Sequence, residues 1–128
     1  MIAMIEIGLT HVSQLVVSDD VTAIAMGSGD LPVLATPVMM ALMENAAMLA
    51  VAPHLPQGST TVGGYIAASH VKPTAVGHTV SATATVTAVD GRKIEFAVAA
   101  HCGETLLGEG SHTRFIVDRD RFMARLAE

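Results

Sequence analysis

The first side chain that calls for a chemical explanation is Glu44, which lies midway in an otherwise apolar stretch from Pro37 to Ala52. An ionised carboxylate in such surroundings is costly unless it is paired, hydrogen-bonded or open to water. A charged partner or a wet cleft would remove that cost, and both are features of active sites. The alternative interpretation is that Glu44 and Asn45 together form an exposed polar seam on a helix.

Thr36 is the second candidate, because it precedes Pro37 where this apolar stretch begins. A threonine followed by proline is typical of a helix N-cap and first helical residue, and capping alone would explain Thr36. Free amides at a helix N-terminus also favour negative charge, so a hydroxyl there could meet an acyl carbonyl. Glu44 follows eight residues later, about 12 Å along the axis and about 80° around it. The two residues can therefore face one cleft without touching.

The third candidate is His70, near the end of the segment GGYIAASHVKP. Histidine is the most common general acid or base near neutral pH, although a lone strand histidine is more often structural. Gly63 and Gly64 open the same segment and indicate a bulge or a close backbone approach. A freed amide there could stabilise an oxyanion, whereas a simple bend is the plainer alternative. Cys102 is in phase with apolar strand positions and is predicted to belong to the core.

The elements that must position these residues follow from hydrophobic periodicity. The sequence predicts a strand over Thr10 to Val17, a short helix over Asp20 to Met26, and a long helix from Thr36 to about Ala52 that is apolar on every face and therefore buried. Strands are predicted over Thr60 to Val71, from Val80 to a hairpin turn at Asp90-Gly91, onward from Arg92, and over Thr105 to Val117, before a helix over Asp118 to Leu126. We expect an α+β fold in which a curved antiparallel sheet wraps around the long helix, as in the hotdog fold. An ordinary two-layer α+β sandwich with a different strand order is the alternative.

Composition narrows the class of protein. The chain has 128 residues, which predicts a single domain over 1–128, and a net charge of −5. Its first lysine or arginine is Lys72, so we expect no nucleic-acid partner. No basic leader or membrane-length apolar run is evident, and one cysteine fits a reducing cytoplasm. With few aromatic residues in the core, we expect a partner subunit to add burial, a tightly packed monomer being the alternative.

Together these segments resemble the fluoroacetyl-CoA thioesterase-like family of hotdog-fold proteins. The resemblance covers nearly the whole chain and is most specific in ATPVMMALMENAA, GGYIAASHVKPTAVG and GEGSHTRFIVD. It implies an acyl-CoA thioesterase, with sites at the interface of a homodimer or dimer of dimers. It further implies that Thr36, Glu44 and His70 are catalytic, and that Gly63, Gly64 and Arg114 bind substrate. On this basis Glu44 would be the nucleophile or base and His70 the proton donor, with Thr36 orienting the glutamate or the thioester carbonyl. We expect no metal and no cofactor.

One departure from the family concerns the acyl group. Fluoroacetyl-specific members carry phenylalanines ahead of the catalytic threonine, whereas this chain has MGSGDLPVLAT there. The resemblance therefore implies another short or medium acyl group. Two alternatives remain at this point: a hotdog hydratase or dehydratase, which would need an Asp and a His close together, and a non-catalytic acyl-CoA binder or regulatory subunit.

Overall fold

A computed structural model describes residues 5–127, and its elements follow the order that the sequence predicts. Two helical turns, η1 (Asp19–Val21) and η2 (Ala52–His54), accompany the main elements. The main elements are β1 (Thr10–Val16), α1 (Ala23–Met26), α2 (Thr36–Val51), β2 (Ser59–Ala68), β3 (Thr79–Asp90), β4 (Lys93–Cys102), β5 (Thr105–Asp118) and α3 (Arg119–Leu126).

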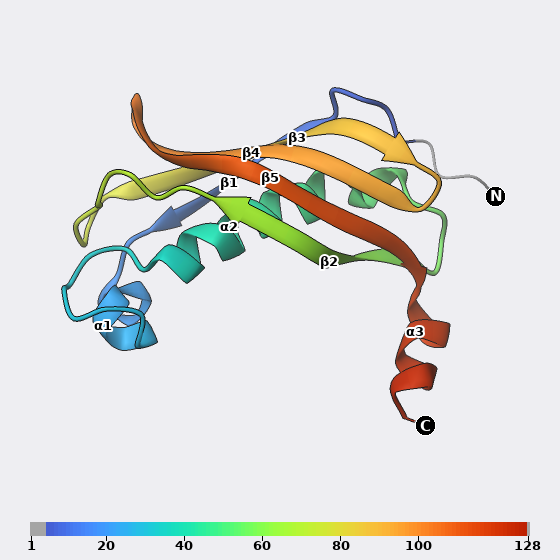
Figure 1. Ribbon diagram of the computed structural model, residues 1–128, viewed down its shortest axis with the longest axis horizontal. Coiled ribbons are helices and arrows are strands. Elements are labelled where there is room, and N and C mark those ends of the chain that lie inside the picture. The colour runs from blue at the N-terminus through green and yellow to red at the C-terminus, as the bar shows by residue number, and fades with distance from the viewer. Residues whose placement is uncertain (1–4, 128) are drawn as a thin grey trace.

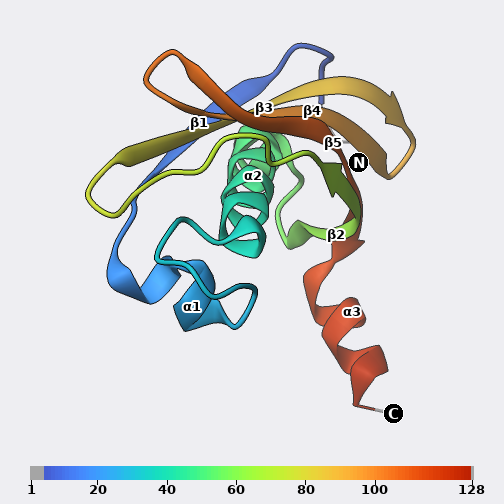
Figure 2. The same cartoon turned by 60° about the vertical axis from the view of Figure 1, so that its left-hand side comes forward.

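The strands form one antiparallel sheet in the order β1-β3-β4-β5-β2. The sheet curls over α2, while α3 leaves the end of β5 and points away from it (Figures 1 and 2). This arrangement confirms the predicted hotdog fold. Consecutive hairpins join β3, β4 and β5, and Gly91 has the positive φ of +59° that a tight turn requires. The four later strands do not follow one another across the sheet, however, because β2 crosses to the far edge and pairs with β5.

Helix α2 is built from strong helix formers and packs mainly on β1 and β3. Its buried residues are Met39, Met43, Ala46, Ala47, Ala50 and Val51. The prediction of burial on every face is wrong, because Pro37, Ala41, Asn45 and Leu49 remain exposed along one stripe. By length and composition the stretch Thr36–His54 could cross a membrane, so the prediction that no apolar run reaches that length is wrong. Packing of its buried residues against the sheet accounts for part of that apolar composition.

The core between the helix and the sheet is aliphatic, as the composition predicts. Alternate residues of β3 and β4 point inward, and Phe96 is the largest fully buried side chain. Glycine allows β5 to pass close to the end of β2 and the residue after it, because a β-carbon at Gly110 would collide with the backbone of Ala67 and one at Gly108 with that of Ser69. The sheet therefore holds β2 and the following loop firmly against β5, which is where several candidate residues lie.

Candidate active site

Thr36 and His70 meet at the start of α2. The Thr36 hydroxyl oxygen lies 2.7 Å from His70 Nδ1, a short and therefore strong hydrogen bond. Strand β2 ends at Ala68 rather than at Val71, so His70 lies in the loop beyond the strand and not within it. That loop is anchored to β5 by hydrogen bonds from the backbone amides of Ser69 and Val71. The imidazole is thus presented to the helix by a fixed segment.

The predicted role of Thr36 as an N-cap is wrong. Ala35 occupies the N-cap position and no side chain caps the helix, while Thr36 is already the first helical residue. Alanine cannot accept a capping hydrogen bond, so the helix start gives up that contribution of about 1 kcal/mol. The Thr36 hydroxyl is directed to His70 instead. A residue that would stabilise the helix in the usual way is therefore used to orient an imidazole.

His70 is half-buried and has one ring nitrogen without a partner. Its Nε2 is buried and makes no hydrogen bond to any part of the chain between residues 5 and 127. Desolvation by burial lowers the pKa of His70, although the backbone of Lys72 opposes this. The ring is consequently neutral at pH 7, with one nitrogen able to donate and the other to accept.

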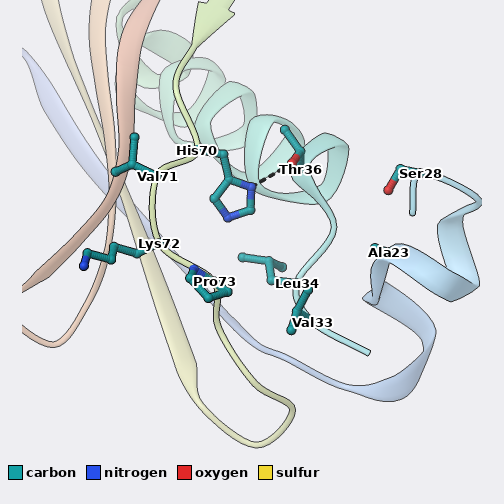
Figure 3. A pocket seen from close by; sticks show the side chains of 9 residues that line it. All are labelled: Ala23, Ser28, Val33, Leu34, Thr36, His70, Val71, Lys72 and Pro73. Atoms are coloured by element: carbon teal, nitrogen blue, oxygen red, sulfur yellow. Dashed lines mark hydrogen bonds between the residues drawn. The ribbon is translucent and has the colours of Figure 1, made fainter. Parts of the chain in front are cut away.

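A pocket of about 270 Å³ adjoins this pair. Figure 3 shows the imidazole between Thr36 and the segment Val71–Pro73, with Leu34 below it. The lining residues are mostly small or aliphatic and include no aromatic side chain other than His70 itself: Ala23, Ser28, Val33, Leu34, Thr36, His70, Val71, Lys72 and Pro73. An unpartnered nitrogen beside an open pocket of this kind is suited to bind a polar atom of a substrate.

Glu44 lies in a second cluster, two turns further along α2. Its side chain is half-buried, so the carboxylate does not point into open solvent. A β-carbon at Gly63 would lie 2.9 Å from Glu44 Oε2, 3.4 Å from His112 Cε1 and 3.6 Å from Arg114 Nη1. The missing side chain of Gly63 is therefore what admits the carboxylate. Asn45 is exposed and accepts a hydrogen bond from Ser13, so it does not share this cluster.

Arg114 is only 7% exposed and is held by three hydrogen bonds. Its Nε donates to Thr61 Oγ1 at 2.8 Å and its Nη2 donates to the Thr61 carbonyl at 2.9 Å. Its Nη1 lies 3.2 Å from His112 Nε2. Burial lowers the pKa of Arg114 and the charge of Glu44 raises it, but a guanidinium remains charged in either case. Arg114 thus supplies a fixed positive charge inside the protein.

The predicted bulge at the glycine pair is confirmed. The register between β2 and β5 shifts between Gly63 and Tyr65, so that Gly64 is the extra residue. Gly64 does not face the carboxylate, because the atoms nearest to its β-position all belong to the ring of Phe115. The geometry therefore places Gly63 beside Glu44 and leaves Gly64 on the opposite side of the strand.

Within residues 5–127 the structure brings the candidates together in two groups rather than one. Thr36 joins His70, and Glu44 joins Gly63 and Arg114, but no hydrogen bond connects the two groups. Cys102 is half-buried and packs against the edge of the core, in keeping with its prediction as a core residue. No set of three metal-ligating side chains occurs among these residues.

Sequence reasoning missed His112 and Thr61, which complete the second group. His112 is 1% exposed, and its Nδ1 lies 2.6 Å from the Tyr65 carbonyl. The alternation His112-Thr113-Arg114 places the histidine and the arginine on the same face of β5, which was the available signal. Thr61 offers no comparable signal, because its role depends on the pairing of β2 with β5.

Comparisons with known proteins agree with this architecture. Residues 17–120 match the family described as "Fluoroacetyl-CoA-specific thioesterase". A curated fluoroacetyl-CoA thioesterase from Streptantibioticus cattleyicolor is 36% identical over 96 residues, which is 75% of this chain and 69% of that protein. A solved structure of a fluoroacetyl-CoA thioesterase superposes with a TM-score of 0.89 at 31% identity, covering 96% of both chains. A thioesterase superfamily member from Thermus thermophilus has a TM-score of 0.88 at 25% identity, over 95% of this chain and 90% of that one.

Proposed function

Because this chain belongs to the fluoroacetyl-CoA-specific thioesterase family, whose members are thioester hydrolases, we propose that it hydrolyses a short- or medium-chain acyl-CoA to the free acid and CoA. The observation that carries the proposal is the hydrogen-bonded Thr36–His70 pair beside an open pocket. A buried nitrogen without a partner is unfavourable, and a bound substrate atom would remove that cost.

His70 is assigned as the proton donor to the leaving thiolate. When the Thr36 hydroxyl donates to Nδ1, the single proton of the neutral ring must lie on Nε2. Loss of that proton from a neutral ring would leave an imidazolate, so the ring first takes a second proton from solvent at Nδ1, with the Thr36 oxygen as its acceptor. The imidazolium then passes the Nε2 proton to sulfur as the carbon–sulfur bond breaks, and the ring returns to its neutral form. Thr36 accordingly orients His70, in place of the expected contact with the glutamate or the thioester carbonyl.

Glu44 is assigned as the base or the nucleophile. As a base, its carboxylate takes a proton from the water whose oxygen attacks the thioester carbon and displaces the CoA thiolate. As a nucleophile, it attacks that carbon directly, displaces the thiolate and forms a mixed anhydride, which water then hydrolyses to the free acid and the original carboxylate. Either step needs a carboxylate oxygen that is not tied up by a cation. Gly63 leaves room for that oxygen, and the guanidinium of Arg114 lies close to it.

A second copy of the chain is proposed to bring the two groups together, as a homodimer or a dimer of dimers. In one chain Thr36 and Glu44 lie about 12 Å apart along α2, so the carboxylate does not reach His70. Strand β2 lies at a free edge of the sheet, where Tyr65 is 60% exposed. An unpaired edge is a template for another strand, and a partner there would also cover the exposed stripe of α2.

The proposed acyl group draws support from the pocket lining, and the proposed cytoplasmic location draws support from the cysteine. The pocket beside His70 is lined by aliphatic residues such as Val33 and Leu34, which favours an apolar acyl group over fluoroacetyl. Cys102 is a free thiol, in keeping with a reducing cytoplasm. Acyl-CoA is the proposed partner of the site, with no nucleic acid and no membrane.

The test is a panel of acetyl-, fluoroacetyl-, butyryl-, hexanoyl- and octanoyl-CoA, read by release of thiol. We expect the protein to release CoA from at least one ester, and Glu44→Gln to reduce kcat at least about a hundredfold. Glu95→Gln is the matched control, because Glu95 is exposed on β4, on the face opposite to its buried neighbours Ile94 and Phe96. Absence of thiol release from every ester, or an unchanged rate in Glu44→Gln, would refute the proposal.

Shared sites can be tested by subunit complementation. The variants Glu44→Gln and His70→Asn are each expected to be nearly inactive. Co-expressed with different tags and purified through both, they should regain activity, because each mixed dimer then contains one intact site out of two. If the site lay within a single chain, the mixed dimers would remain as inactive as their parents.

A further inference from the structure

His112 on β5 is a buried histidine to which the mechanism above gives no role. Its Nδ1 lies 2.6 Å from the Tyr65 carbonyl, and its Nε2 lies 3.2 Å from Arg114 Nη1. A carbonyl oxygen can only accept, so Nδ1 donates. A guanidinium can only donate, so Nε2 accepts. The two neighbours therefore fix the neutral ring in one tautomer.

Two charged groups lie near His112, one on its own strand and one on the central helix. Arg114 lies on the same strand, and Glu44 approaches from α2. Strand β2 contributes the Tyr65 carbonyl, and β4 contributes Phe96, whose ring stacks on the imidazole at 6.0 Å between centroids. Burial lowers the pKa of His112, with the Tyr65 hydrogen bond opposing it, Arg114 adding to it and Glu44 opposing it. The ring is thus neutral and able to accept from Arg114 at pH 7.

Arg114 and Glu44 face each other across Gly63 without forming an ion pair. The position that a β-carbon of Gly63 would take lies 2.9 Å from Glu44 Oε2 and 3.6 Å from Arg114 Nη1. Attraction should draw these groups together, since opposite charges interact strongly in a buried site. Two hydrogen bonds to Thr61, from Nε and Nη2, and the contact of Nη1 with His112 hold the guanidinium away from the Glu44 carboxylate. Within residues 5–127, His112 is the only hydrogen-bond partner of Nη1, which is the guanidinium nitrogen nearest to the β-position of Gly63.

We propose that His112 is a positioning residue whose Nε2 holds Arg114 short of an ion pair with Glu44 and so leaves the carboxylate free to react. Without that acceptor, Nη1 turns to Glu44 and its hydrogen bonds occupy the oxygen that must take a proton or attack the thioester. A carboxylate bound to a guanidinium is a weaker base and a weaker nucleophile. This inference rests on the proposed role of Glu44 in thioester hydrolysis.

Two substitutions separate the two hydrogen bonds of the ring. His112→Gln can place its amide oxygen near the position of Nε2 and keep an acceptor for Arg114. His112→Asn can place its amide nitrogen near the position of Nδ1, which keeps the donor to Tyr65 but removes the acceptor. Both lose the stacking on Phe96, so they share any cost that arises from packing alone. His101→Asn on β4 is the control for replacing a histidine outside the site.

In steady-state kinetics with the best ester of the panel, we expect His112→Asn to lower kcat at least about tenfold with KM within about twofold. His112→Gln should retain kcat within about threefold of the wild type. A purely structural role would affect both variants alike and would follow their melting temperatures. Equal loss of kcat in the two variants, or no loss in His112→Asn, would overturn the proposal.

Crystal structures of the two variants give a readout that needs no activity. In His112→Asn we expect Arg114 Nη1 to form an ion pair with Glu44, whereas in His112→Gln it should keep its present position. An unmoved guanidinium in His112→Asn contradicts the positioning role even if turnover falls. If the wild type hydrolyses no ester, the proposed function fails, and these structures still decide whether His112 holds Arg114.

Discussion

The two groups of candidate residues differ in how completely their polar atoms are satisfied. At the start of α2, Thr36 is exposed, His70 is half-buried, and Nε2 has no partner beside an open pocket. In the group around Glu44, the β5 residues Arg114 and His112 are almost fully buried, and each polar atom of their side chains is hydrogen-bonded. The first group is open and incomplete, while the second is enclosed and complete apart from the carboxylate of Glu44.

This difference indicates a division of labour. A polar atom that the fold leaves unpaired is available to a ligand, so the Thr36–His70 group should contact the substrate and contribute little to stability. A buried charge with three hydrogen bonds is expensive to disturb, so changes around Arg114 should affect both folding and turnover. A loss of folding stability on changing the Thr36–His70 group, or unchanged turnover on changing the surroundings of Arg114, would contradict this division.

The largest effect is expected from His70→Asn. Asparagine can keep the hydrogen bond to Thr36, because its amide nitrogen approximates Nδ1, but it removes Nε2 altogether. We expect kcat to fall about a hundredfold or more, the usual scale for loss of a general acid, with the melting temperature within about 2 °C of the wild type. Thiol release and thermal unfolding measure the two quantities. His54→Asn in the exposed turn η2 is the control, and unchanged turnover in His70→Asn would remove the open group from catalysis.

A smaller effect is expected from adding one methyl group at Gly63. The new β-carbon would lie 2.9 Å from Glu44 Oε2, and neither Gly63 nor Gly64 requires a positive φ. Gly63→Ala should therefore displace the carboxylate and lower kcat about tenfold, without backbone strain. Gly64→Ala meets Phe115 instead and should change kcat less than about twofold. Equal kcat values for the two variants, measured by thiol release, would show that the carboxylate tolerates displacement.

Much of the fold could be predicted from local patterns. Alternation and the Asp90-Gly91 turn specify the hairpin of β3 and β4, and the apolar stretch after Thr36 specifies the central helix. The position of β2 could not be predicted from these patterns, because its pairing with β5 is set by the path of the chain around α2. The exposed stripe of α2 was missed for a related reason. A helix that is apolar all round is expected to be buried, but a single copy of the sheet covers only one side.

The candidate site was predictable where a residue was out of place in its surroundings. Glu44 is such a residue, because it is a carboxylate in an apolar helix, and the structure gives it a charged neighbour in Arg114. Thr36 was misinterpreted as a cap, because threonine before proline has an ordinary structural explanation. His112 was overlooked, because a histidine in a polar strand segment is unremarkable until tertiary contacts bury it. The roles of both depend on partners far away in the sequence.

The third prediction tests the reassignment of Thr36. Thr36→Val removes the hydroxyl but keeps the shape, so it should lower kcat by up to about tenfold, the scale of one hydrogen bond. Since Thr36 does not cap α2, the free energy of unfolding should change by less than about 0.5 kcal/mol. Thr36→Ser keeps the hydroxyl and should remain within about threefold in kcat. A loss of about 1 kcal/mol in urea unfolding of Thr36→Val would restore the capping role instead.

The smallest effect concerns stability against pH. Burial lowers the pKa of both His70 and His112 below 6.5, so between that value and the folded pKa the unfolded chain binds more protons than the native one. Stability is therefore present above pH 6.5 and is lost as the pH falls below it. We expect the melting temperature to fall by about 2–5 °C between pH 7.5 and pH 5. His112 is the more deeply buried of the two, so His112→Gln should reduce this slope more than His70→Asn does. The reverse order would mean that protonation at the open group, rather than the enclosed one, governs acid stability.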